Sequence, residues 1–210
     1  MATLLHIDSS ADLTGSASRR LTARFADSWT QRGHDVVRRD LFLDQPPHLP
    51  TNALHWAPGL RAAGETVDPA DERYQQLLIG ELLDADVVLL GAPMYNWSVP
   101  STLKAWIDWT HVPGLTAPAG ANDPAPLGEK PIVIASGRGL AYGPTSGNSD
   151  HELAALTQLF ANSMQMTVYP VLAELTLATR VPDLAQYAED GAASMAAAEA
   201  EIDRLVSLFG

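Results

Sequence analysis

Two spacings of apolar residues alternate along the chain. In some short segments the apolar residues lie side by side, which is typical of strands that are buried on both faces of a parallel sheet. In the longer segments between them, apolar residues recur every three or four positions, the spacing of a helix with one buried face. The apolar runs that predict strands cover residues 3–7, 87–90, 131–135 and 167–172.

The helical spacing is clearest in the segment after the first strand. Leu21, Phe25 and Trp29 recur every four residues and form one apolar stripe, and Gly33 ends the segment. The same spacing predicts further helices, of which the last has Asp183 as its N-cap. These further helices cover residues 72–83, 100–109, 152–164 and 183–210.

Residues 35–41 predict a strand of another kind. They mix valines with Arg38, Arg39 and Asp40, and charges at the edge of a sheet discourage pairing with other chains. We therefore place this strand second in the sequence and outermost in space. With right-handed crossovers, the alternation predicts an α/β fold of three layers, α/β/α, with a five-stranded parallel sheet in the order 2-1-3-4-5. No repeat or linker divides the chain, so a single domain over 1–210 is expected.

Two segments follow neither spacing. Residues 42–70 contain five prolines and interrupted apolar residues, which predict a long irregular connection with a short helix over 53–63. Residues 111–129 are rich in Pro, Gly and Ala and predict a loop. Loops of this length inside a domain tend to be functional. We therefore expect residues 42–70 and 113–126 to form walls of a substrate pocket.

Composition narrows the classes of function. The chain has 210 residues, of which 46% are hydrophobic and 18% charged, and these values are typical of a globular protein. A net charge of −12 predicts a surface that repels nucleic acid. No apolar run approaches the roughly 18 residues of a membrane span, and no basic leader precedes Asp8, so a cytoplasmic protein without a membrane partner is expected. Because the chain has no cysteine, and no metal-ligand cluster is recognised, redox chemistry would require a bound cofactor.

The loop after the first strand is rich in hydroxyl groups. In parallel sheets, ligands bind beyond the carboxyl ends of the strands. Ser10, Ser16 and Ser18, with free N–H groups of the loop and of the first helical turn, are arranged to cradle a phosphate. Capping of the helix by Ser16 or Ser18 is the alternative interpretation.

Two more unusual loops follow the strands at 87–90 and 131–135. The first places Tyr95 and Trp97 around Asn96, which suits a planar ligand, although an ordinary strand-to-helix turn is the alternative. In the second, Gly137 and Gly139 allow the backbone to approach a ligand closely. Neither a G-x-G-x-x-G nor a G-x-x-x-x-G-K-[ST] motif is present, which disfavours a dinucleotide-binding Rossmann domain and a nucleoside triphosphatase.

Together the three loops resemble those of the FMN-dependent NADH:quinone oxidoreductases and azoreductases, which are flavodoxin-like proteins. The likeness spans nearly the whole chain, and Pro93-Met94-Tyr95-Asn96 is its most specific part. The resemblance implies that the first loop binds the FMN phosphate, the second lines the isoalloxazine ring and the third covers the pyrimidine end of the ring. The implied cofactor-binding residues are Ser10, Ser16, Ala17, Ser18, Met94, Tyr95, Asn96, Trp97, Ser136, Gly137, Arg138 and Gly139.

Some positions depart from the family pattern. Ala17 replaces a common glutamine, and Ser136-Gly137-Arg138-Gly139 stands where Ser-Arg-Gly-Gly is usual, without the histidine that often follows. The first change keeps the backbone donor to the phosphate. The second lies on the side of the acceptor, so the natural acceptor is predicted less sharply than the cofactor.

The resemblance implies a two-electron transfer from NADH or NADPH to a quinone or azo-type aromatic acceptor. Because one crevice would stack a single planar group on the flavin and no second dinucleotide motif is present, we expect a ping-pong reaction. Tyr95 and Tyr142 are candidates for a hydrogen bond to that acceptor. A specialised reductase of one biosynthetic or xenobiotic intermediate and a non-catalytic FMN electron carrier are the alternatives. The resemblance also implies a homodimer, for which we expect Trp56, Trp106 and Trp109 to offer exposed apolar area.

Overall fold

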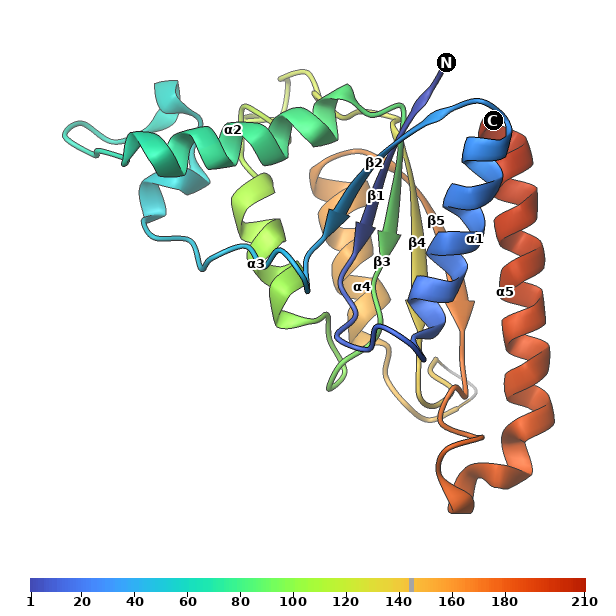
Figure 1. The fold of residues 1–210 in the computed structure, drawn as a ribbon. Coiled ribbons are helices and arrows are strands. Elements are labelled where there is room, and N and C mark those ends of the chain that lie inside the picture. Colours follow the sequence, from blue (N-terminus) through green and yellow to red (C-terminus); the bar gives the residue numbers. More distant parts are fainter. Residues whose placement is uncertain (144–145) are drawn as a thin grey trace.

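A parallel sheet lies at the centre of the molecule (Figure 1). The structure is a computed structural model and describes residues 1–143 and 146–210. Within these residues the sheet has five strands in the order β2-β1-β3-β4-β5, so the predicted topology and the outermost position of β2 are confirmed. The strands are β1 (Thr3–Asp8), β2 (Asp35–Asp40), β3 (Val87–Gly91), β4 (Pro131–Gly137) and β5 (Thr167–Ala173), and every pair is parallel.

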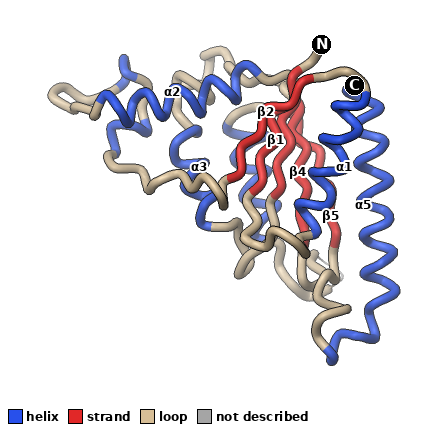
Figure 2. The backbone as a smooth tube through the Cα atoms, viewed as in Figure 1, coloured by secondary structure: helices blue, strands red, loops and turns tan. Residues whose placement is uncertain are grey.

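Helices cover both faces of the sheet (Figure 2). One face packs against α1 and α5, and the other packs against α2, α3 and α4. Because successive side chains of a strand point to opposite faces, Leu4 packs in the core beneath α1 and α5, and Leu5 packs in the core beneath α2, α3 and α4. The three-layer prediction is therefore confirmed. The helices are α1 (Ala17–Gln31), α2 (Pro69–Asp84), α3 (Ser101–Thr110), α4 (His151–Thr157), which continues into a π-helical turn over Gln158–Ser163, and α5 (Ala188–Phe209).

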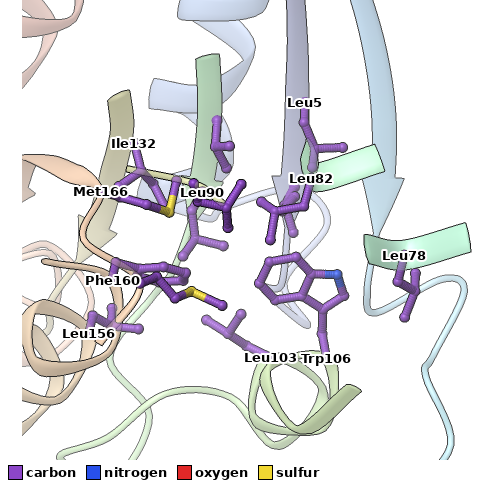
Figure 3. Packing of buried hydrophobic residues seen from close by; sticks show 14 of the residues in the cluster. Leu5, Leu78, Leu82, Leu90, Leu103, Trp106, Ile132, Leu156, Phe160 and Met166 are labelled. Atoms are coloured by element: carbon purple, nitrogen blue, oxygen red, sulfur yellow. The ribbon is translucent and has the colours of Figure 1, made fainter. Parts of the chain in front are cut away.

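Two tryptophans of α3 are buried, which corrects a prediction. Trp106 is 1% exposed, and Figure 3 shows its ring among Leu82, Leu90 and Leu103. Trp109 is fully buried and its Nε1 donates to the backbone oxygen of Pro47 at 2.7 Å. Both side chains therefore belong to the core and offer no area to a partner in this structure. Sequence spacing did not reveal this, because the residues that cover α3 come from a distant segment.

That distant segment is the irregular connection at residues 42–68. Gln75 of α2 ties it down: its Nε2 donates to the backbone oxygens of Leu54, at 2.7 Å, and of Trp109, at 3.1 Å. Trp56 lies on its surface and is 41% exposed, as expected. The predicted irregular connection is confirmed, but the helix expected over 53–63 is replaced by two short 3-10 turns, Asn52–His55 and Pro58–Leu60.

The start of α5 differs from its prediction. Asp183 does not cap the long helix but lies in a separate 3-10 turn, Pro182–Tyr187, and α5 begins at Ala188. The reason is tertiary packing. Gly191 lies so close to the segment after β5 that a Cβ added to it would be 2.9 Å from the Leu175 oxygen. A side chain at position 191 would not fit, so this close packing fixes how the first turns of α5 lie against the segment after β5.

Candidate functional site

Three loops converge on one cavity of about 430 Å³ at the carboxyl ends of the strands. We call residues 9–18 the serine loop, 93–98 the aromatic loop and 136–143 the glycine loop. Tyr95 joins the first two directly, because its hydroxyl accepts a hydrogen bond from the Ala11 N–H at 3.0 Å and lies 3.2 Å from Ser10 Oγ. The predicted convergence is thus present. The lining also includes Thr176, Leu177, Thr179 and Arg180, from the segment after β5, which sequence reasoning missed.

The N-terminus of α1 points hydrogen-bond donors at this cavity. Ser16 Oγ caps the helix by accepting the Arg19 N–H at 3.3 Å, and it lies 3.0 Å from Ser18 Oγ. The N–H groups of Ala17 and Ser18 belong to the first turn, where a helix supplies no acceptor. Capping and anion binding are therefore compatible, since the cap uses the Arg19 N–H group and leaves that of Ala17, which lines the cavity, whereas Ser18 is fully buried behind it.

Asp12 occupies two other amides of the serine loop. Its Oδ1 accepts the N–H groups of Gly15 at 2.8 Å and Thr14 at 3.0 Å, and these bonds, that of Gly15 first, lower the pKa of the carboxyl. The expectation that the loop amides are free is therefore wrong for these two. Because a carboxylate repels an anion, the surroundings of Asp12 are unfavourable for an anion, and those of Ser16 and Ala17 are more favourable.

Arg19 anchors the serine loop to β2. Its Nε and Nη2 donate to the Ser10 backbone oxygen at 3.1 and 2.8 Å, while Nη1 and Nη2 donate to the two Asp40 oxygens at 2.6 and 2.9 Å. Burial acts to raise the pKa of Asp40, but hydrogen bonds from Arg19 and the backbone outweigh it, so the pKa is lowered and the carboxyl stays charged. Sequence reasoning missed this anchor. The sequence did contain a signal for it. Arg19 lies in the first turn of the helix that follows the serine loop, and the next strand, β2, ends in Asp40.

The aromatic loop makes a tight turn with a left-handed backbone. The Tyr95 and Ser98 backbones bond to each other at 2.8 and 3.1 Å, and between them Asn96 and Trp97 have φ values of +49° and +64°. Such values are unfavourable for bulky residues and are found in strained functional loops. Met94 and Tyr95 line the cavity, whereas Asn96 and Trp97 project beyond it, and Trp97 is 61% exposed.

The glycine loop presents only its glycines to the cavity. Gly137 and Gly139 line it, and a Cβ on Gly137 would lie 2.8 Å from the Ala17 Cβ, so glycine is needed for the close approach to α1. The side chains of Ser136 and Arg138 are each 1% exposed and lie in a buried ion cluster instead. Tyr142 is half-buried with its ring centre 5.9 Å from the Arg138 guanidinium carbon, and it does not line the cavity.

The two long irregular segments do not border this cavity. Residues 113–126 lie at the edge of the sheet where the strands begin, and the Ala57 N–H donates to the Pro113 oxygen at 3.4 Å (Figure 1). Neither this loop nor residues 42–70 contribute to the lining. The prediction that they wall the pocket is therefore wrong for the single chain, because both cover α3 and α2 instead.

A family model described as a flavodoxin-like fold matches residues 2–206. The chain belongs to this family. An FMN-dependent NADH:quinone oxidoreductase of Kineococcus radiotolerans is 44% identical over 203 residues, covering 94% of this chain and 95% of that protein. A protein of the same name from Streptomyces coelicolor is 37% identical over 199 residues, covering 89% and 85%. These relatives confirm the predicted family and the prediction that the chain is an oxidoreductase enzyme.

Solved structures agree with the fold. An azoreductase from Bacillus anthracis str. Sterne superposes with a TM-score of 0.80 at 19% identity and covers all of both chains. An FMN-dependent NADH-azoreductase from Bacillus anthracis str. Ames Ancestor, in complex with FMN, gives a TM-score of 0.75 at 17% identity and covers 99% of both chains. At this identity the likeness concerns the arrangement of the elements.

The described part of the chain shows neither a membrane-spanning helix nor a metal-binding cluster. Among residues 1–143 and 146–210, no helix is both long and apolar enough to cross a bilayer. Over the same residues, no three His, Asp or Glu side chains gather where they could hold a metal ion.

Proposed function

We propose that this protein is an FMN-dependent NADH:quinone oxidoreductase that also accepts azo compounds. The observation that carries the proposal is a cavity with Ser16 and Ala17 of the α1 N-terminus at one end and Met94, Tyr95 and two glycines at the other. The names of the relatives support the same function. The donor set explains how a phosphate is held without lysine, because the Ala17 N–H, serine hydroxyls and the helix dipole all favour an anion.

The residues of the cavity fit FMN in a specific orientation. Ser16, Ala17 and Ser18 would hold the phosphate, and Met94 with Tyr95 would lie along the isoalloxazine ring. Gly137 and Gly139 would present backbone to the ring's pyrimidine end, because their lack of a Cβ lets this loop pack closely against Ala17 and Leu177. When bound, FMN supplies the redox chemistry, accepting hydride from NADH and passing two electrons to the acceptor. The protein orients these groups and excludes water from them.

Titration of the apoprotein with FMN tests the cofactor. We expect one non-covalent FMN per chain and a yellow protein. Replacing Ser16 and Ser18 by alanine weakens FMN retention without unfolding the domain, since the helix keeps its packing against the sheet. A protein that stays colourless with excess FMN would refute the proposed function.

We infer a ping-pong reaction in which the nicotinamide and the acceptor use the same place in succession. The cavity has room to stack one planar group on the flavin, and no dinucleotide motif is available to hold the nicotinamide elsewhere. Parallel double-reciprocal lines with NADH and a quinone are the expected kinetic pattern. Repeating the assay with NADPH measures the donor preference. Intersecting lines would indicate a ternary complex and sink the ping-pong mechanism.

A homodimer that borders the cleft is part of the proposal. Trp56, Leu43 and Leu60 are exposed apolar residues of the 42–68 segment and would suit an interface core. Light scattering at micromolar concentration is expected to give twice the mass of one chain, and a monomer would refute the dimer.

A further inference from the structure

The polar side chains of the glycine loop form a buried ion cluster on the side away from the cavity. Arg138 Nη1 lies 2.8 Å from Asp150 Oδ2 and 3.6 Å from Glu174 Oε1. Arg138 Nε lies 3.4 Å from Glu152 Oε2, and Ser136 Oγ donates to the same carboxylate oxygen at 2.8 Å. We call these five residues the Arg138 cluster: Ser136, Arg138, Asp150, Glu152 and Glu174.

The cluster shares its backbone with the cavity wall. Arg138 stands between Gly137 and Gly139, which line the cavity, while its side chain points into the cluster. The Gly137 oxygen accepts the Met94 N–H at 3.1 Å, and the Arg138 oxygen accepts the Thr176 N–H and hydroxyl, both at 2.9 Å. Arg138 is joined by single peptide bonds to two residues of the cavity wall. A movement of the cluster, or a change in its charge, therefore affects the backbone that lines the cavity.

The charges in the cluster do not balance. One guanidinium faces the carboxylates of Asp150, Glu152 and Glu174, and its Nη2 has no hydrogen-bond partner among the described residues. Glu152 is fully buried, and burial raises its pKa to about 7, against the opposing effects of Ser136 and Arg138. The ionisable groups that face Glu152 are Arg138 from the end of β4 and Asp150 from the N-terminus of α4. Glu174, after β5, faces the same guanidinium.

We propose that Arg138 and Glu152 are positioning residues that hold the Gly137–Gly139 backbone against the flavin, and that the charge on Glu152 sets the flavin's reduction potential. The inference rests on the proposed function, since it needs a flavin in the cavity. Neither residue touches the cofactor. Both act through the backbone that carries Arg138 and through the electric field of a poorly solvated cluster, where charges are weakly screened.

The direction of the effect follows from the charge balance of the reaction. Hydride transfer from NADH releases NAD⁺ and brings two electrons and one proton to the flavin, which adds one negative charge to it. An ionised Glu152 repels that charge, and a neutral Glu152, which takes its proton from solvent, does not. The reduced form is therefore favoured when Glu152 is protonated. Glu152→Gln, which is always neutral, imitates the protonated form at every pH.

The test compares the FMN-loaded wild type with Glu152→Gln by equilibration with a redox dye. At about pH 8.5 the ratio of the affinity for reduced FMN to the affinity for oxidised FMN should be about tenfold higher in the variant than in the wild type. For a two-electron couple this corresponds to a reduction potential about 30 mV more positive. At about pH 6 the difference should disappear, because Glu152 is then protonated. Glu201→Gln is the matched control. Glu201 is also paired with an arginine, Arg204, but it lies on the exposed side of α5, so its potential curve should follow the wild type.

The outcomes separate this inference from the proposed function. A yellow Glu152→Gln protein whose potential follows the wild type at both pH values would overturn the inference and leave the proposed function intact. A wild-type protein that binds no FMN would overturn both. If Glu152→Gln does not fold, Ser136→Ala decides: loss of this hydrogen bond raises the pKa of Glu152 further, so the bend in the potential should lie at a higher pH than in the control variant, and a bend at the same pH overturns the inference.

Discussion

The serine loop and the glycine loop are both predicted to bind FMN, one at the phosphate and the other at the ring, but their polar side chains are arranged in opposite ways. In the serine loop polar groups border the cavity: Ser10 and Ser16 line it, and the Ala17 N–H at the end of α1 is left for a ligand. In the glycine loop the polar side chains of Ser136 and Arg138 turn away from the cavity into the core.

The difference has a simple cause. The first N–H groups of a helix have no acceptor within the helix and bond to water when no ligand is present. The serine loop can therefore bind an anion with groups whose exposure to solvent does not destabilise the fold. The glycine loop follows a central strand that is covered on both faces, and a charged side chain there must find partners inside the protein. Arg138 finds them in Asp150, Glu152 and Glu174. Recognition thus depends on direct contacts at one loop and on buried support at the other.

Removing Arg138 should have the largest effect on stability. Arg138→Met leaves the carboxylates of the Arg138 cluster buried without their cation, and breaking a buried ion pair in this way costs about 3–5 kcal/mol. Urea denaturation of the apoprotein measures the loss. Arg204→Met is the control, because Arg204 is 56% exposed on α5 and its pair with Glu201 adds little. Equal losses in the two variants would show that the cluster does not support the fold.

The pH dependence of apoprotein stability should follow Glu152. Burial raises the pKa of Glu152 to about 7, so the folded state holds this proton more tightly than the unfolded state. The resulting stabilisation is complete below the unfolded pKa and is lost as the pH rises through about 7. The total is roughly 3 kcal/mol, of which about 2 kcal/mol lies between about pH 5.5 and 8.5. Denaturation at both pH values should show this part of the loss in the wild type and not in Glu152→Gln. Identical pH profiles would contradict it.

In the serine loop, single substitutions should separate capping from ligand binding. Ser16→Ala removes the N-cap and is expected to cost about 1 kcal/mol of stability, together with weaker FMN binding. Ser18→Ala leaves the cap in place, so it should weaken FMN binding with a smaller loss of stability. Calorimetric titration with FMN and thermal melts of the apoprotein measure the two effects. Ser207→Ala on α5 is the control, since its hydroxyl donates to the Asp203 oxygen of its own helix and accepts from Arg32 at the C-terminal end of α1, away from the cavity. Unchanged FMN affinity in both serine-loop variants would place the phosphate elsewhere.

The smallest effect is expected in the aromatic loop. Trp97→Gly relieves a left-handed backbone, a gain partly offset by the flexibility that glycine adds to the unfolded chain, so the net stabilisation should be about 0.5 kcal/mol. The same change should raise the KM for a quinone more than the Kd for FMN, because Trp97 lies outside the cavity. Trp56→Gly is the control: Trp56 is also exposed but has a φ of −124°, so glycine there should destabilise. A destabilised Trp97→Gly would mean that the turn is not strained.

The order of the sheet and the place of the cleft could be predicted from the sequence alone. Short apolar runs separated by helices with one apolar stripe leave few arrangements, and right-handed crossovers select one of them. Because parallel strands end at one edge, the loops holding Ser16, Tyr95 and Gly137 had to meet there. These results depend on the local spacing of apolar residues and on the connectivity of the chain, and both are given directly by the sequence.

The tertiary structure alone decided where individual side chains point. Trp109 is buried because residue 47, which is distant in the sequence, covers it, and the first turns of α5 pack through Gly191 on Leu175, which lies after β5. Arg138 turns away from the cavity because its carboxylate partners come from two later segments of the chain. Such contacts join residues far apart in the sequence, and each depends on the packing of several elements at once, so no local pattern of hydrophobic and polar positions contains them.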